Sequence, residues 1–154
     1  MKFTGKIDVP GPRQAVFEKL RDAHFFASCV DGVQDLVEID DRHYTATLET
    51  RVAYIKFKFA VSVEIVELDE PNRVVARVEG TPIGMVGRLT ATSAADLTEQ
   101  NGGTAVNYEL DVALTGKLGS LGQPVLKSKA KEMERQFASR IQAKFQAVNT
   151  GSET

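Results

Sequence analysis

The chain has 154 residues, a formal net charge of −2 and one cysteine, Cys29. This length predicts one domain, residues 1–148, followed by a polar tail at 149–154, and it needs neither disulfide nor metal to support a core. The charge argues against a nucleic-acid-binding protein. One cysteine excludes an internal disulfide and a cysteine-rich metal site. With no signal-like N-terminus and no membrane-spanning apolar run, we expect a cytoplasmic protein.

The N-terminal part predicts a strand and two short helices. Side chains alternate in character over Phe3–Val9, and Pro10-Gly11-Pro12 ends this strand. Apolar residues at helical spacing predict one helix over Gln14–Asp22 and a second over Ala23–Val30. A turn at Asp31-Gly32 then leads into the central part of the chain.

The central part predicts a meander of strands without intervening helices. In Tyr54–Leu68 the apolar residues from Phe57 to Ile65 alternate with polar ones, which is typical of an antiparallel strand with one buried face. Gly80–Gly87 predicts an apolar, glycine-punctuated loop. The expected strands are Val33–Asp40, His43–Val52, Tyr54–Leu68, Arg73–Glu79, Arg88–Thr98 and Thr104–Leu114.

An apolar stripe from Leu118 to Val148 predicts a long helix, with Pro124 fixing where it begins. Charged residues are expected on its other faces, and they include Lys127, Glu132 and Glu134. No second helix of this length is expected, so a sheet must cover the stripe. The fold class is therefore α+β, with a curved antiparallel sheet of about seven strands wrapped around the long C-terminal helix.

Positive charge is concentrated in this last segment. Lys117 to Val148 contains seven Lys or Arg residues and two Glu. Such a face is typical of a solvated helix, and alternatively of a docking surface for anionic lipid or an acidic partner.

Few residues point to catalysis. His24 and His43 lie beside aspartates, where capping or surface roles are expected, and Cys29 has no obvious base nearby. The histidines and the cysteine give no metal-ligand spacing, and the spaced glycines lack the context of a phosphate-binding loop. We therefore expect neither a metal site nor a nucleophile.

Six motifs along the chain point to a known family. They are Phe3-Thr4-Gly5, the run from Val9 to Phe17, Cys29-Val30-Asp31-Gly32, Gly116–Gly122, Lys129–Met133 and Gln136-Phe137. These motifs resemble those of the CoxG family of carbon monoxide dehydrogenase subunits, within the START-like (SRPBCC, polyketide-cyclase-like) helix-grip superfamily. The resemblance covers residues 2–147, with Asp31 standing where the family usually has proline.

The resemblance implies a hydrophobic ligand held between the helix and the sheet, although a filled core is the alternative. The pocket is expected at one end of the fold, with the glycine-flanked loop as its lid or mouth. The expected ligand-binding residues are Phe25, Phe26, Tyr54, Phe57, Phe59, Ile83, Met85, Val86, Leu89, Tyr108, Leu118, Leu121, Val125 and Met133. No catalytic residue and no covalently bound cofactor are expected.

The resemblance also implies a function. It is that of a non-enzymatic accessory protein that binds a lipid or a lipoquinone such as menaquinone. Its partners would be a carbon monoxide dehydrogenase-type molybdenum hydroxylase and, through peripheral contact, the inner face of the cell membrane. One alternative is a cyclase or hydratase, with Tyr44, Arg51, Tyr54 and Tyr108 converging in the cavity. Another is an assembly or recruitment factor without a ligand.

Overall fold

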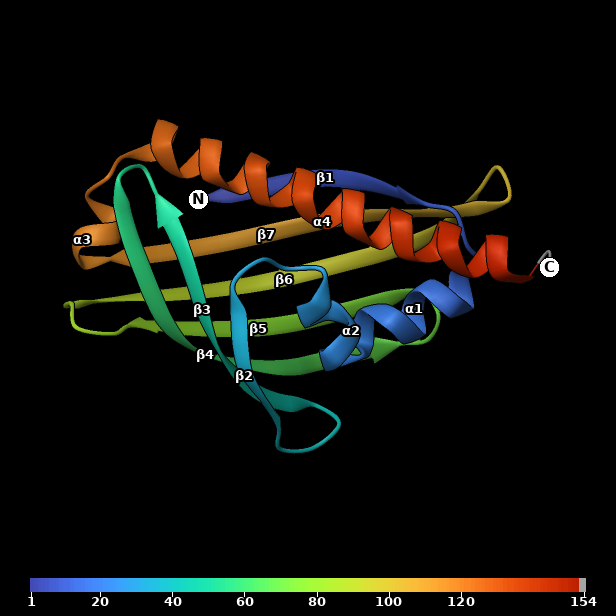
Figure 1. Ribbon diagram of the computed structural model, residues 1–154, viewed down its shortest axis with the longest axis horizontal. Coiled ribbons are helices and arrows are strands. Elements are labelled where there is room, and N and C mark those ends of the chain that lie inside the picture. The colour runs from blue at the N-terminus through green and yellow to red at the C-terminus, as the bar shows by residue number, and fades with distance from the viewer. Residues whose placement is uncertain (153–154) are drawn as a thin grey trace.

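The computed structural model describes residues 1–152, and their side chains up to residue 146. One antiparallel sheet has the strand order β1-β7-β6-β5-β4-β3-β2, and the long helix α4 lies across its concave face (Figure 1). The strands are β1 Lys2–Val9, β2 Val33–Glu38, β3 His43–Val52, β4 Ile55–Asp69, β5 Arg73–Pro82, β6 Gly87–Gln100 and β7 Gly103–Thr115. The helices are α1 Arg13–Arg21, α2 Ala23–Ser28, α3 Gly116–Gly119 and α4 Gln123–Ser152.

The predicted α+β class is confirmed, and so is the predicted order of elements up to the last strand. The largest differences from the predicted bounds lie at the end of β5 and at the start of the long helix. Strand β5 continues to Pro82, because Gly80 and Pro82 pair with Val61 and Phe59 of β4. The predicted loop at Gly80–Gly87 is therefore wrong in its extent, since only residues 83–86 connect β5 to β6.

The apolar stripe belongs to two helices. The short α3 ends at Gly119, and α4 begins after Gly122, whose φ of +92° suits glycine. Pro124 lies in the first turn of α4, as predicted. Helix α4 continues to Ser152, so the helix takes in most of the predicted tail 149–154. The side chain of Val148 and residues 153–154 lie outside the described part of the chain.

The strand register determines which side chains face α4. Directly opposed residues in an antiparallel pair share a face. Leu48 is opposite Phe59, and Tyr44 is opposite Val63, so these alternate positions line the concave face. At the other edge of the sheet, Tyr108 of β7 is opposite Gly5 of β1 on the same face.

Two separate clusters of buried residues hold the helix and the sheet together. The α1 core lies between α1 and the second half of α4, whereas the α3 core lies at the beginning of α4. The α1 core contains Ile7, Val9, Val16, Phe17, Cys29, Ile65, Val74, Leu97, Val106, Ile141 and Phe145. The α3 core contains Val52, Phe57, Phe59 and Leu118, with half-buried residues packed against them.

Candidate functional site

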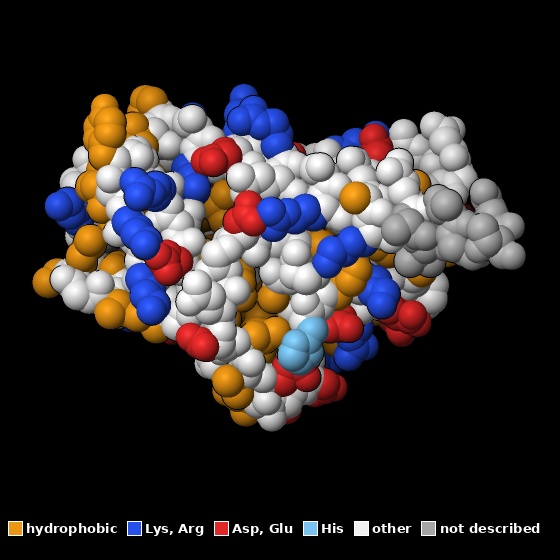
Figure 2. Space-filling model, viewed as in Figure 1, with side chains coloured by type: hydrophobic (Ala, Val, Ile, Leu, Met, Phe, Trp, Pro, Cys, Tyr) orange, Lys and Arg blue, Asp and Glu red, His pale blue; other side chains and the backbone are white. Residues whose placement is uncertain are grey.

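The middle of the concave face, between the two cores, is not sealed. Its apolar side chains are half-buried, although they lie on central strands of the sheet. Examples that belong to neither core are Ala46, Val63, Val78 and Leu110. Figure 2 shows hydrophobic side chains in the middle of the molecule, below α4. Apolar surface that water reaches inside a fold is typical of a ligand-binding space.

Seven of the predicted ligand-binding residues come together in the α3 core. Phe57 and Phe59 are buried there, with their rings stacked at a centroid distance of 5.7 Å. Leu118 of α3 is also buried, and four half-buried residues complete this group. They are Met85, Leu89, Leu121 and Val125. This group closes one end of the space below α4.

The predicted single pocket that joins Phe25 and Phe26 to the Ile83–Val86 loop is wrong. The ring of Phe25 lies 6.2 Å from that of Phe145, and the ring of Phe26 lies 5.0 Å from that of Phe137. Helix α2 therefore packs on the second half of α4. The Ile83–Val86 loop lies beside α3 at the opposite end of the molecule (Figure 1).

Two other predicted residues also lie away from the α3 core. Tyr108 packs against the α1 core, and Met133 of α4 is half-buried outside both clusters. These two side chains therefore lie farther along α4 from the Ile83–Val86 loop than the α3 core does. The sequence pattern predicts instead that they share one pocket with that loop.

Three predicted pocket residues face solvent instead. Tyr54 is 95 % exposed, Val86 is 89 % exposed and Ile83 is 53 % exposed. They occupy the two-residue β3–β4 turn and the β5–β6 turn, which project beyond the sheet, so no strand covers them. We call these three residues the apolar tip. Figure 2 shows hydrophobic and basic side chains together at this end of the molecule.

Basic residues surround the apolar tip. Arg51 and Lys56 are paired across β3 and β4, next to Tyr54. Lys117 follows Gly116, which forms a bridge with Gly87 beside Val86. Lys56 pairs with Glu49, whereas Arg51 and Lys117 form no ion pair within residues 1–146. The tip therefore combines exposed apolar side chains with uncompensated positive charge.

A carboxylate and a phenol meet inside the concave face. The sequence-based expectation that Glu134 lies on a solvent-facing side of the helix is wrong. Its Oε1 atom and the Tyr108 hydroxyl both lie over Gly5. The pKa of Tyr108 is well above its usual value, because burial and, to a smaller extent, a hydrogen bond to Glu134 both raise it. Helical spacing gives a signal for this position, because Glu134 precedes Phe137 by three residues.

The four polar groups expected for an enzyme do not converge. Arg51 and Tyr54 are exposed, and Arg51 lies on the outer face of β3. Tyr44 and Tyr108 are on the concave face, but strands β4, β5 and β6 separate their strands. This arrangement gives no paired acid and base.

The histidines and the cysteine have structural partners. The Nδ1 atom of His43 lies 2.8 Å from Asp40, and its Nε2 atom lies 3.1 Å from Glu64. The Asp22 side chain caps α2 by accepting from the backbone amides of His24 and Phe25. Cys29 is buried in the α1 core. Among the described residues, no group of three metal-ligating side chains is present.

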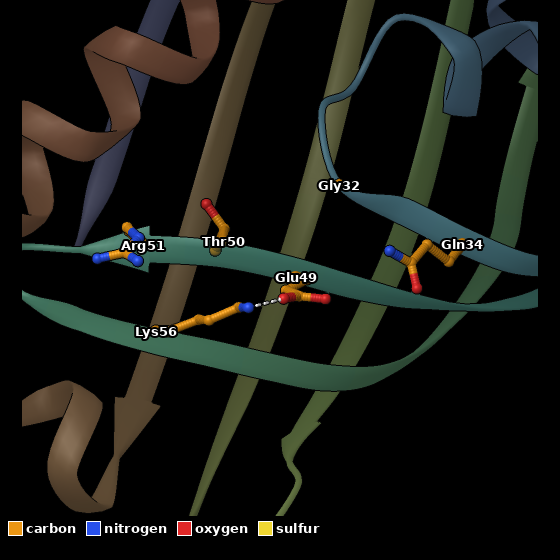
Figure 3. Close-up of a pocket in the computed structure, with 6 residues that line it drawn as sticks. All are labelled: Gly32, Gln34, Glu49, Thr50, Arg51 and Lys56. Carbon is orange, nitrogen blue, oxygen red and sulfur yellow. Dashed lines mark ion pairs between the residues drawn. The ribbon is translucent and has the colours of Figure 1, made fainter.

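A polar hollow of about 330 Å³ opens on β2, β3 and β4. Figure 3 shows its lining, in which Lys56 and Glu49 form an ion pair. Gln34 and Arg51 also contribute to it, whereas Thr50 points away from these charged groups. An open hollow lined by charged and polar side chains does not resemble an apolar ligand site.

Comparison with known protein families gives one match over most of the chain. The model of the carbon monoxide dehydrogenase family CoxG matches residues 5–146. No curated protein matches the chain. In the described part of the chain, we find no helix with the length and apolarity needed to span a bilayer.

Solved structures share the fold. A conserved protein from Geobacillus kaustophilus is 26 % identical, with a TM-score of 0.87 and 96 % of each chain covered. Protein Ms6760 from Mycobacterium smegmatis is 19 % identical, with a TM-score of 0.65, covering 92 % of this chain and 88 % of its own. Ara h 8.0201 is 14 % identical, with a TM-score of 0.67, covering 96 % of this chain and 98 % of its own. The helix-grip fold is thus confirmed.

Proposed function

Since the chain belongs to the CoxG family of carbon monoxide dehydrogenase subunits, we propose that it binds a lipid or a lipoquinone such as menaquinone beneath α4. Family membership supports an accessory role beside carbon monoxide dehydrogenase. A bound lipoquinone would allow such an accessory protein to link a molybdenum hydroxylase to the respiratory chain. The proposed ligand is long and apolar, and the protein supplies a binding surface instead of a reaction.

One observation carries the ligand proposal. Ala46, Val63 and Val78 lie on inner strands of the sheet and face α4, yet they stay half-buried and belong to neither core. Burial of apolar surface stabilises a protein by about 25 cal/mol per Å². An apolar ligand that covers these side chains would remove their remaining apolar surface from water, and this burial would contribute favourably to the free energy of binding.

Ligand extraction and a cavity-filling variant test this proposal. We expect organic extracts of the purified protein to contain a lipid or quinone by mass spectrometry, and added short-chain menaquinone to raise the melting temperature. Val63→Phe should abolish this shift by filling the space. Ser62→Phe is the matched control, because Ser62 is exposed on the opposite face of β4. Absence of any bound lipid and of any shift would refute ligand binding.

The apolar tip supports a second element of the proposal, which is peripheral contact with an anionic membrane. Among the side chains that the structure describes, Tyr54 and Val86 are the most exposed large apolar ones, and Arg51 and Lys117 lie beside them. Basic residues near an anionic bilayer contribute about 1 kcal/mol each, and apolar side chains add insertion into the interface. Contact at the tip would place the α3 end of the ligand space next to the lipid.

Vesicle flotation tests the membrane contact. We expect binding to phosphatidylglycerol vesicles, weaker binding to phosphatidylcholine vesicles, and loss of binding in the double variant Tyr54→Ser, Val86→Ser. The control is Val37→Ser, Ile39→Ser, because these apolar residues are also exposed but lie at the β2 end of the sheet. Equal flotation of both double variants would contradict the assignment of the tip. Capture of the dehydrogenase by a lipid-free protein would favour the assembly factor instead.

A further inference from the structure

Glu134 is a carboxylate on the sheet-facing side of α4. It lies three residues before Phe137 and seven before Ile141, and both of these pack into or against the α1 core. Positions at these spacings share one face of a helix. Glu132, by contrast, is exposed and pairs with Lys129 at 3.3 Å. The two carboxylates of this turn therefore lie in different environments.

Within residues 1–146, Glu134 has one protein partner and no cationic partner. The Tyr108 hydroxyl donates to it, and no Lys or Arg within residues 1–146 forms an ion pair with it. An ionised carboxylate has about four acceptor positions, of which a single phenol fills one. Carboxylates withdrawn from water are unfavourable unless they are hydrogen-bonded. Glu134 thus retains acceptor capacity inside an otherwise apolar space.

Gly5 makes room for this pair. A Cβ atom at position 5 would overlap the Glu134 carboxylate and the Tyr108 ring and hydroxyl. Glycine weakens a strand, and within strands it marks a close approach of other groups. Position 5 is therefore explained by the polar pair above it, and the resemblance motif Phe3-Thr4-Gly5 acquires a structural role.

The pair is flanked by apolar surface on the sheet side. Phe3 and Leu110 are opposed across β1 and β7, two positions along from Gly5 and Tyr108, and both are half-buried. A flat ring or chain lying against these side chains would present a polar substituent to Tyr108 and Glu134.

We propose that Tyr108 and Glu134, over Gly5, form a polar subsite that accepts a hydrogen bond from a ligand hydroxyl. This inference rests on the proposed function and names the chemistry of one end of its ligand. A carboxylate accepts but does not donate, so the subsite favours a hydroxyl over a carbonyl. For a lipoquinone, it therefore favours the hydroquinone over the quinone.

Binding of one short-chain menaquinone in its two redox states tests the subsite. Under anaerobic conditions, we expect the protein to bind the dithionite-reduced form about tenfold more tightly than the oxidised form, since hydrogen bonds to charged groups are strong. Glu134→Gln should bring this ratio close to one, because it removes the charged acceptor and introduces an N–H donor that can bind a quinone carbonyl. Glu132→Gln should keep the wild-type ratio.

The outcomes separate the two proposals. If the protein binds both forms equally, or if Glu134→Gln keeps the preference, the subsite is refuted and ligand binding stands. If the protein binds neither form, both proposals fail. A purely structural role would lower the melting temperature of Glu134→Gln and weaken both forms equally, and this result would also overturn the subsite.

Discussion

The ring of Phe145 in α4 lies over Gly11, where a Cβ atom would lie 2.5 Å from its Cδ1 atom. Both residues are buried, and Phe145 belongs to the α1 core. Contact between the bend after β1 and the second half of α4 thus depends on the absence of a side chain at position 11.

Gly11→Ala should therefore destabilise the protein. Overpacking in a core costs about 1–3 kcal/mol, and we expect this loss in the free energy of unfolding measured with urea. Gly80→Ala is the matched control, because the nearest atom to a Cβ there is 3.6 Å away, at an ordinary contact distance. Equal stability of the two variants would show that Phe145 moves aside without cost.

His43 should give stability a dependence on pH. Hydrogen bonds to Asp40 and then to Glu64 raise the pKa of His43 above 6.5. A histidine whose pKa is higher in the folded than in the unfolded state stabilises the fold. This stabilisation is complete at pH values below the pKa of the unfolded state, and it is lost as the pH rises through the pKa of the folded state. The amide of Arg42 and the His43 ring lower the pKa of Asp40, so its contribution is lost as pH falls below 3.8 and through its lowered value.

The contribution of this pair should therefore be fullest between about pH 4 and 6.5. We expect the difference in melting temperature between the wild type and His43→Asn to shrink from pH 6 to pH 8. A proton NMR titration of the imidazole measures the raised pKa directly, and His24→Asn assigns its signal. A difference that grows with pH would contradict the ion-pair geometry.

Cys29 should be protected from thiol reagents. Its side chain is completely buried in the α1 core, so a reagent reaches it only when the structure opens. In the folded protein we expect modification by Ellman's reagent to be at least a hundredfold slower than in urea. A Cys29→Ala, Ser139→Cys variant provides the exposed control, because Ser139 lies on the solvent side of α4. Equal labelling rates would exclude a buried thiol.

The fold was largely predictable, because strand alternation and helical spacing are local patterns that the sheet and α4 both satisfy. The position of the site was less so. Because both residues are hydrophobic, the sequence pattern predicts that Phe25 and Ile83 share one pocket. Tertiary packing places α2 at one end of the fold and the β5–β6 turn at the other, and local sequence patterns do not reveal this. Residue type assigns Glu134 to solvent, although its spacing to Phe137 indicates the inner face. A charged residue at a helix position that faces the sheet therefore indicates a polar site, and helical spacing reveals such a position whereas residue type does not.

Substitutions of Tyr54 in the β3–β4 turn and of Phe57 in β4 should differ sharply in how much they change the free energy of unfolding. Phe57 is 1 % exposed in the α3 core, whereas Tyr54 contacts mainly solvent. Phe57→Ala should cost about 3–5 kcal/mol, because it removes a buried ring and leaves a cavity. Tyr54→Ser should change the free energy of unfolding by less than about 0.5 kcal/mol, since surface substitutions rarely do more.

Urea unfolding of both variants measures this contrast, with the m-value as a check on two-state behaviour. A large loss in Tyr54→Ser would mean that the apolar tip supports the fold, and its role at a membrane surface would then lose its basis.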